Sequence, residues 1–266
     1  MTFLDALVLF LAAVMGGTLN AVAGGGSFFC FPALIFTGIP PIQANATNTV
    51  ALWPASIASA SAYRHELKKQ SLVALLLLPG SSLIGGILGA QLLLGTSQAT
   101  FTQLVPYLLL LATLLFAVSP PLTRLLRKRR EETQTESTGI QKHGIAALVL
   151  VAFAQLLISI YGGFFGGGIG IMMLATLSLM GMDNIHEMNG IKTVLTIIIN
   201  GAAVVLFILR GAVVWPQALL MILGSIIGGY AGAYYARKID PKYVRIFVIC
   251  IGLGLSAYFF IRQLSA

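Results

Sequence analysis

The chain has 266 residues, of which 58% are hydrophobic and only 9% are charged. Soluble domains carry about 25% charged residues, so this composition excludes an ordinary soluble protein and indicates a polytopic membrane protein. The net charge of +8 does not indicate nucleic-acid binding, because the basic residues gather in short loops between apolar segments, where such residues set membrane orientation.

Apolar segments recur along the whole chain, and most have the roughly 17 to 25 residues that a helix needs to cross a bilayer. In chain order the predicted helical segments are 3–22, 27–38, 44–63, 71–94, 101–119, 144–162, 169–181, 189–209, 213–236 and 243–261. Two of these segments, 27–38 and 169–181, are too short to span comfortably. Trp53 and Trp215 are interpreted as interfacial anchors or as walls of a pocket.

Residues 120–143 are predicted to form a linker between two membrane units. They open with Pro120-Pro121, carry five basic residues between positions 124 and 130, and continue through Ser/Thr-rich sequence. The linker divides the chain into a first membrane repeat, 1–119, and a second membrane repeat, 144–266.

The two halves match each other in sequence as well as in hydropathy. Three pairs of short motifs occur in the same order at offsets of about 142, 144 and 143: Gly24–Gly26 with Gly166–Gly168, Thr49–Val50 with Thr193–Val194, and Ile84–Ala90 with Ile227–Ala233. Any one match can arise by chance among glycine-rich membrane helices. A nearly constant offset over three matches indicates a duplicated unit.

The distribution of basic residues predicts how the two units are oriented. The linker is the most basic loop, which places it in the cytoplasm. The basic loop 64–69 then lies inside, whereas its counterpart near residue 210 lies outside, so the halves are inverted. Each glycine-centred pair of segments, 3–38 and 144–181, must enter and leave on one side. This predicts an all-α polytopic protein of two inverted repeats, each a Gly-broken helical hairpin plus three transmembrane helices, with both termini outside.

The two glycine runs are predicted to break helices inside the membrane. Glycine lacks a Cβ atom, so a helix stops easily there and exposes backbone amides. Broken helix at membrane depth is tolerated only where protein buries it or where it lines a cavity. Matching breaks in two halves are the best sequence pointer to a transporter binding site. The alternative for each run is close helix packing through small residues.

Helices that begin after Gly26 and Gly168 could point their partly positive N-terminal ends at a common centre, which would favour an anion. Polar side chains at the starts of segments 44–63 and 189–209 could add donors. The candidate substrate-binding residues are Asn20, Gly24, Gly25, Gly26, Ser27, Asn45, Thr47, Asn48, Gly166, Gly167, Gly168, Asn189, Lys192 and Thr193.

Lys192 lies about one turn inside an apolar segment, where an ionisable group is costly and indicates function. The alternative is a lysine that snorkels to the cytoplasmic interface. No catalytic, metal-binding or cofactor-binding arrangement is present, and the two cysteines, Cys30 and Cys250, lie in apolar segments without ligand spacing. No phosphate-binding loop of the Walker type occurs, so we expect neither an enzyme nor an ATP-driven pump.

Several motifs resemble the TauE/SafE sulfite exporter family over essentially the whole chain. They are Asn20–Ser27, Phe31–Leu34, Gly38–Pro41 and Ala46–Asn48 in the first half, and Gly162–Gly170, Met188–Lys192 and Gly228–Gly232 in the second. The resemblance implies a carrier, acting as an exporter, that moves sulfite or a related small sulfur-containing oxyanion or organosulfonate across the cytoplasmic (inner) membrane.

Two positions depart from the family pattern. The family often has an acidic residue at the place of Asn20 and a lysine at the place of Asn48, and both are neutral amides here. We therefore expect ion coupling, by a proton or by sodium, to differ from that of other members. The alternatives to a carrier are an anion channel with the same site and a non-transporting membrane scaffold or sensor.

The partners that we expect are the sulfur-containing anion, the lipid bilayer and a coupling ion, with no nucleic acid. A homo-oligomer is a further possibility, because two small-residue faces can pack either between protomers or within one chain. These faces are formed by Gly85, Gly86 and Gly89 and by Gly228, Gly229 and Gly232.

Overall fold

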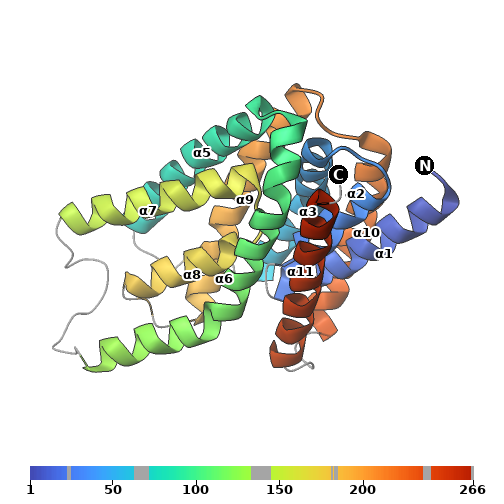
Figure 1. Cartoon of the computed structure of the whole chain (residues 1–266). Coiled ribbons are helices and arrows are strands. Elements are labelled where there is room, and N and C mark those ends of the chain that lie inside the picture. Colours follow the sequence, from blue (N-terminus) through green and yellow to red (C-terminus); the bar gives the residue numbers. More distant parts are fainter. Residues whose placement is uncertain are drawn as a thin grey trace.

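The computed structural model describes residues 1–22, 25–62, 72–132, 145–180, 182, 185–235 and 241–264. Ten helices make up this part of the chain, which confirms the predicted all-α class (Figure 1). They are α1 (Phe3–Val22), α2 (Ser27–Phe36), α3 (Pro41–Ala62), α5 (Leu72–Gly95), α6 (Gln98–Glu132), α7 (Ile145–Phe164), α8 (Ile169–Leu179), α9 (Ile185–Leu209), α10 (Trp215–Tyr235) and α11 (Pro241–Leu264).

Five of the described helices contain a stretch long and apolar enough to cross a membrane. These stretches are Phe3–Asn20, Leu77–Gly95, Gln98–Val118, Glu187–Leu209 and Ile246–Leu264. In contrast, α2 and α8 have 10 and 11 residues, which is about 15 Å of helix and only half of the roughly 30 Å hydrocarbon core. The fold is therefore that of a polytopic membrane protein with two helices too short to span it.

Helix α6 extends further than its sequence predicts. The segment 101–119 was predicted to stop before Pro120-Pro121, but α6 continues to Glu132. The residues after the two prolines are mostly Leu, Arg, Lys and Glu, which are strong helix formers, so the helix extends into the first part of the predicted linker. Linker residues 133–143 lie outside the described part of the chain.

Both glycine runs fall between helices. Helix α1 ends at Val22 and α2 begins at Ser27, while α7 ends at Phe164 and α8 begins at Ile169. In the second break, Gly166 and Gly168 have φ angles of +82° and +79°, a left-handed backbone that glycine adopts without steric cost. Gly24 lies outside the described residues.

Helices from the two halves of the chain interleave. Helix α1 packs mainly against α10, and α7 packs mainly against α5, so the first helix of each half contacts the fourth described helix of the other half (Figure 1). The same reciprocity relates α3–α10 to α5–α9. The pairs α3–α9 and α6–α11 each join helices that hold the same place in the order of helices in each half.

The small-residue faces pack within the chain at these reciprocal interfaces. A Cβ atom on Gly85 of α5 would lie 2.8 Å from the carbonyl oxygen of Leu156 in α7. A Cβ atom on Gly228 of α10 would collide with the carbonyl oxygen of Val14 in α1. Absence of side chains lets these helix backbones approach closely, so the described part of both faces is used inside one protomer.

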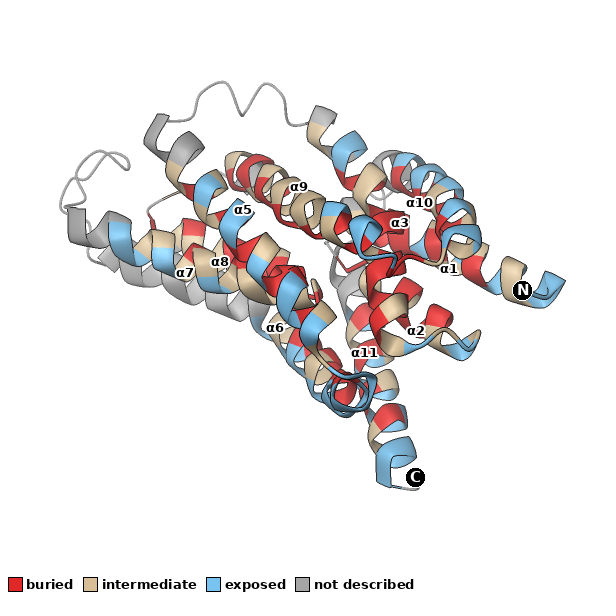
Figure 2. Cartoon of the chain, turned by 90° about the horizontal axis from the view of Figure 1, so that it is seen from above, coloured by how far each residue is buried: buried red, intermediate tan, exposed pale blue. Residues whose placement is uncertain are grey.

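Buried residues concentrate on α3 and on the surfaces of α1, α2, α9 and α10 that pack against it (Figure 2). The outer helices instead expose large apolar side chains, including Leu88, Leu157, Leu223 and Leu253. An apolar exterior is what lipid chains require, so the exposed faces are those of a membrane-embedded protein. Helix α3 is consequently the element at the centre of the fold.

Candidate substrate site where two helix breaks meet

One turn of α3 is hydrogen-bonded to both breaks. The amide nitrogen Nδ2 of Asn45 donates to the carbonyl oxygen of Phe164 at 2.9 Å, and Nδ2 of Asn48 donates to Oγ of Ser27 at 3.1 Å. Phe164 is the last residue of α7, and Ser27 is the first residue of α2. Residues three apart on a helix share a face, and both asparagines are only 1% exposed. A single buried surface of α3 thus holds the two breaks together.

Helix α6 covers both breaks from another side. A Cβ atom on Gly25 would lie 3.7 Å from the ring of Phe116, and one on Gly168 would lie 3.4 Å from the Cα atom of Ala112. Ala112 and Phe116 are one turn apart on α6. The rings of Phe31 and Phe165, one from the helix after the first break and one from the second break, meet edge to face at 5.6 Å. The two glycine runs are therefore neighbours.

The breaks lie alongside the apolar part of α6 and not at its end. The apolar stretch of this helix runs from Gln98 to Val118, and Ala112 is about 21 Å along the axis from Gln98. The hydrocarbon core is about 30 Å thick. Interrupted backbone at this depth must be buried in protein, and the contacts with α3 and α6 provide that burial.

The helix ends at the breaks differ in electrical sign. The N-terminal ends of α2 at Ser27 and α8 at Ile169 carry partial positive charge. Some of their first amides are already paired, because Phe28 and Phe29 donate to the carbonyl oxygens of Gly25 and Gly26, and Ile171 donates to that of Gly168. The C-terminal end of α7 at Phe164 carries partial negative charge. An oxyanion would be stabilised at the first two ends without a desolvated cation, and Asn48, which is bonded to Ser27, lies beside one of them.

Lys192 occupies the corresponding place in the second half. A Cβ atom on Gly170, the second residue of α8, would lie 3.2 Å from Cδ of Lys192. The lysine stem therefore packs against the first turn of α8, as Asn48 contacts the first residue of α2. Lys192 is neither fully buried nor fully exposed. Lys192, the charged residue among the predicted site residues, therefore lies near the second break.

Other predicted site residues make contacts that hold helices together. Asn20 donates from Nδ2 to Oγ of Ser56 at 3.0 Å, which ties the end of α1 to α3. Oγ1 of Thr47 accepts from the backbone N–H of Val214 at 3.0 Å, just before α10. Oγ1 of Thr193 donates to the carbonyl oxygen of Asn189 at 2.7 Å, within α9. The structure thus groups Gly25, Gly26, Ser27, Asn45, Asn48, Gly166, Gly167 and Gly168 around the breaks and turns Thr47 toward α10.

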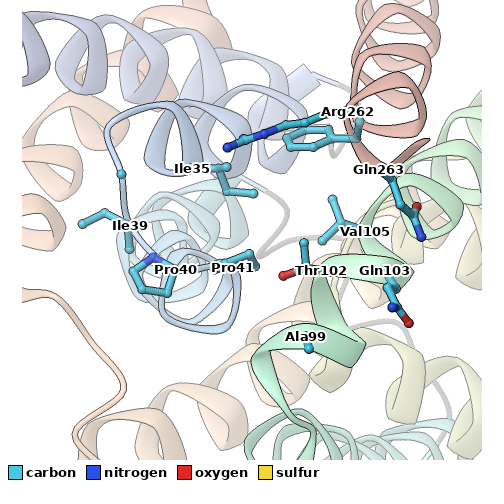
Figure 3. A pocket seen from close by; sticks show the side chains of 12 residues that line it. Ile35, Ile39, Pro40, Pro41, Ala99, Thr102, Gln103, Val105, Arg262 and Gln263 are labelled. Carbon is cyan, nitrogen blue, oxygen red and sulfur yellow. The ribbon is translucent and has the colours of Figure 1, made fainter. Parts of the chain in front are cut away.

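The sequence did not predict two features of the structure, one at the breaks and one away from them. Ala112 and Phe116 look like any apolar residues of a span, yet they cover both breaks. A separate pocket of about 620 Å³ lies where the end of α2 meets the start of α6 and the end of α11 (Figure 3). Thr102, Gln103, Arg262 and Gln263 supply its polar lining, and no motif marks these residues.

The interleaved helical fold, with two broken helices meeting inside the apolar layer, is that of a membrane transport protein. The family model for the sulfite exporter TauE/SafE matches residues 9–259. The chain therefore belongs to the TauE/SafE sulfite exporter family. Because this is a family of transporters, the expectation that the protein is not an enzyme is confirmed.

Three relatives match the chain over nearly its whole length. It is 28% identical over 251 residues to a probable membrane transporter protein of Haemophilus influenzae, covering 94% of this chain and 92% of that one. It is 29% identical over 253 residues to the probable membrane transporter protein ORF9 of Sinorhizobium sp, covering 93% and 89%. The probable membrane transporter protein YfcA of Escherichia coli K12 is 28% identical, covering 94% and 87%. No solved structure matches the chain significantly.

Proposed function

We propose that this protein is a secondary transporter that exports sulfite, or a related small sulfur-containing oxyanion or organosulfonate, by alternating access. The observation that carries the proposal is the pair of hydrogen bonds from Asn45 to Phe164 and from Asn48 to Ser27, which join both helix breaks on one turn of α3. Half-helices that meet inside the membrane are the usual site of substrate binding in secondary transporters.

The proposed architecture is two inverted repeats in the cytoplasmic membrane, with both termini outside. The reciprocal packing of α1 on α10 and of α7 on α5 supports two equivalent units, because units related by a pseudo-two-fold axis must exchange equivalent contacts. The inverted orientation and the side of the termini are proposed from the distribution of basic residues among the loops. In such proteins one unit rocks against the other around a fixed site. The two bodies that we propose move against each other are the packed groups α1–α3–α10 and α5–α7–α9, each of which combines helices from both halves.

The proposed site recognises the negative charge and the oxygen atoms of the substrate. The N-terminal amides of α2 and α8 would bind oxyanion oxygens, the Asn48 amide would lie beside the first set, and Lys192 would add one positive charge beside the second. These groups suit a small, compact anion, because backbone amides can approach it closely where glycine leaves room. The proposal that the substrate contains sulfur is supported by the description of the family as sulfite exporters.

Counterflow in proteoliposomes tests the carrier mechanism. Vesicles that contain the full-length protein and unlabelled sulfite, kept anaerobic, should transiently concentrate labelled external sulfite above its equilibrium level. A channel with the same site would only equilibrate the label. Absence of counterflow with sulfite, thiosulfate, sulfate and short sulfonates would remove the proposal.

Binding to the purified full-length protein tests the site. Lys192→Ala should weaken binding of the transported anion by about tenfold, which corresponds to about 1.4 kcal/mol, whereas Lys192→Arg should retain the charge and most of the affinity. Gly25→Leu should reduce binding because the larger side chain must enter the space between Phe28, Phe116 and Val248. Unchanged affinity in both Lys192→Ala and Gly25→Leu would place the site elsewhere.

A further inference from the structure

The Asn45 side chain presents a buried oxygen that is not hydrogen-bonded within the described part of the chain. Its nitrogen Nδ2 donates to the carbonyl oxygen of Phe164. A carbonyl oxygen can only accept, so the orientation of the Asn45 amide is fixed and Oδ1 is the unpaired end. Oδ1 of Asn48 is likewise buried without a partner, although the Ser27 hydroxyl that it faces can donate or accept.

The surroundings of Asn45 Oδ1 favour a positive ligand. The amide is bonded to the last residue of α7, and the C-terminal end of a helix carries partial negative charge. The carbonyl oxygen of Tyr161, one turn earlier, accepts from the N–H groups of Phe165 and Gly166 at 2.9 and 3.4 Å, so the backbone here turns out of the helix. Unwound carbonyls and half-helix C-terminal ends bind Na⁺ in other transporter folds.

The acidic residues of the chain lie away from the apolar centre. Asp5 stands at the start of the first apolar segment, and Glu187 lies in the first turn of α9, at the start of its apolar stretch. The other six Asp and Glu residues lie between the apolar segments of the sequence. A neutral amide oxygen does not take up a proton at neutral pH, but it is a good ligand for a hard metal cation. A monovalent cation suits neutral oxygens best, since the sites that bind calcium and magnesium use carboxylates.

We infer that Asn45 Oδ1, at the C-terminal end of α7, is a ligand of a sodium ion that is coupled to transport. The inference rests on the proposed transport function, because it assigns the coupling ion of the same site. The cation lies at the negative end of one half-helix, and the anion lies at the positive ends of α2 and α8. Opposite charges at neighbouring positions lower the cost of burying each other, which couples the binding of the two ions.

Direct binding of ²²Na⁺ to the purified full-length protein, without any sulfur-containing anion, tests the cation site. The unmodified protein should bind Na⁺ saturably in potassium-free buffer. Asn45→Ala should weaken this binding at least about tenfold. Asn45→Asp loses the hydrogen bond to Phe164 but keeps a side-chain oxygen and adds a negative charge, so it should retain Na⁺ binding. Gln217→Ala is the matched control, because Gln217 also has a buried, unpaired amide oxygen but lies on α10, and it should bind Na⁺ normally.

The outcomes separate the two proposals. Saturable Na⁺ binding that Asn45→Ala loses, with Asn45→Asp and Gln217→Ala intact, supports the cation site. Three results would overturn the cation site and leave the proposed transport function standing. They are absence of Na⁺ binding in the unmodified protein, normal Na⁺ binding in Asn45→Ala, and sulfite counterflow that is equally fast without Na⁺. Na⁺ binding without counterflow of any tested anion would remove the proposed function instead. If Asn45→Ala is not monodisperse, loss of Na⁺ binding in Asn45→Asp overturns the inference.

Discussion

The indole nitrogen Nε1 of Trp53 donates a 3.0 Å hydrogen bond to the carbonyl oxygen of Ile197. The matched motifs at Thr49 and Thr193 place Ile197 at the position in the second half that corresponds to Trp53 in the first. The same indole lies against Gly201, where a Cβ atom would be 3.2 Å from Cζ2. Trp53 therefore lies at the crossing of α3 and α9, where the two halves meet, and it is a helix-packing residue and not an interfacial anchor.

Loss of this indole hydrogen bond should weaken the contact between the halves. Trp53→Phe retains an aromatic ring but removes the indole donor to the carbonyl oxygen of Ile197, which we expect to cost about 1 kcal/mol of folding stability. Thermal unfolding of the purified protein in detergent measures the effect. Trp215→Phe, a change in a partly exposed tryptophan at the start of α10, is the control, and an equal loss in both variants would contradict the role given to Trp53.

The left-handed backbone at Gly168 should be required for transport. Gly168→Ala would place a Cβ atom at a φ angle of +79°, at a cost of roughly 1–2 kcal/mol, and would also shift the N-terminal end of α8. We expect lower stability and at least about a tenfold loss of anion counterflow. Gly211→Ala carries a comparable strain, because Gly211 has a φ angle of +64°, but open space surrounds it. That variant should lose stability and keep transport; equal transport in both would contradict the prediction.

The two reciprocal helix interfaces should respond alike to overpacking. Gly85→Val forces a side chain into α7, and Gly228→Val forces one into α1. Each change should destabilise the protein by roughly 1–3 kcal/mol, as measured by thermal unfolding. Gly254→Val lies in open space on α11 and should change stability little. A large effect at only one of the two interface positions would argue that the halves are not equivalent.

The Asn48 amide should contribute to anion binding through the first turn of α2. Asn48→Ala removes the hydrogen bond to Ser27 and a nearby donor, and we expect affinity for the transported anion to fall about tenfold. Asn48→Lys would give the first half the charge that Lys192 gives the second, and should raise anion affinity because the positive charge lies beside a helix N-terminus. Equilibrium binding at low salt measures both variants, and weaker anion binding by Asn48→Lys would contradict this reading.

The sequence by itself determined the helices and their interruptions. Apolar length placed each described helix within a few residues of its observed ends, and the glycine runs located both breaks. These features are local, because a span needs only enough apolar residues, and a helix stops where the backbone loses its preference for continuing. The exception was the continuation of α6 to Glu132, where helix-forming residues outweighed two prolines.

Only the tertiary structure decided which elements meet. Contacts between membrane helices depend on the fit of small residues and on polar partners far apart in the chain, since lipid is as apolar as the helix surfaces. The pairing of α1 with α10, the bonds from Asn45 to Phe164 and from Asn48 to Ser27, and the cover that Ala112 and Phe116 give to both breaks all join residues distant in sequence. Hydropathy does not identify which distant residues contact each other. The sequence therefore predicted the two breaks, and only the structure shows that they are neighbours.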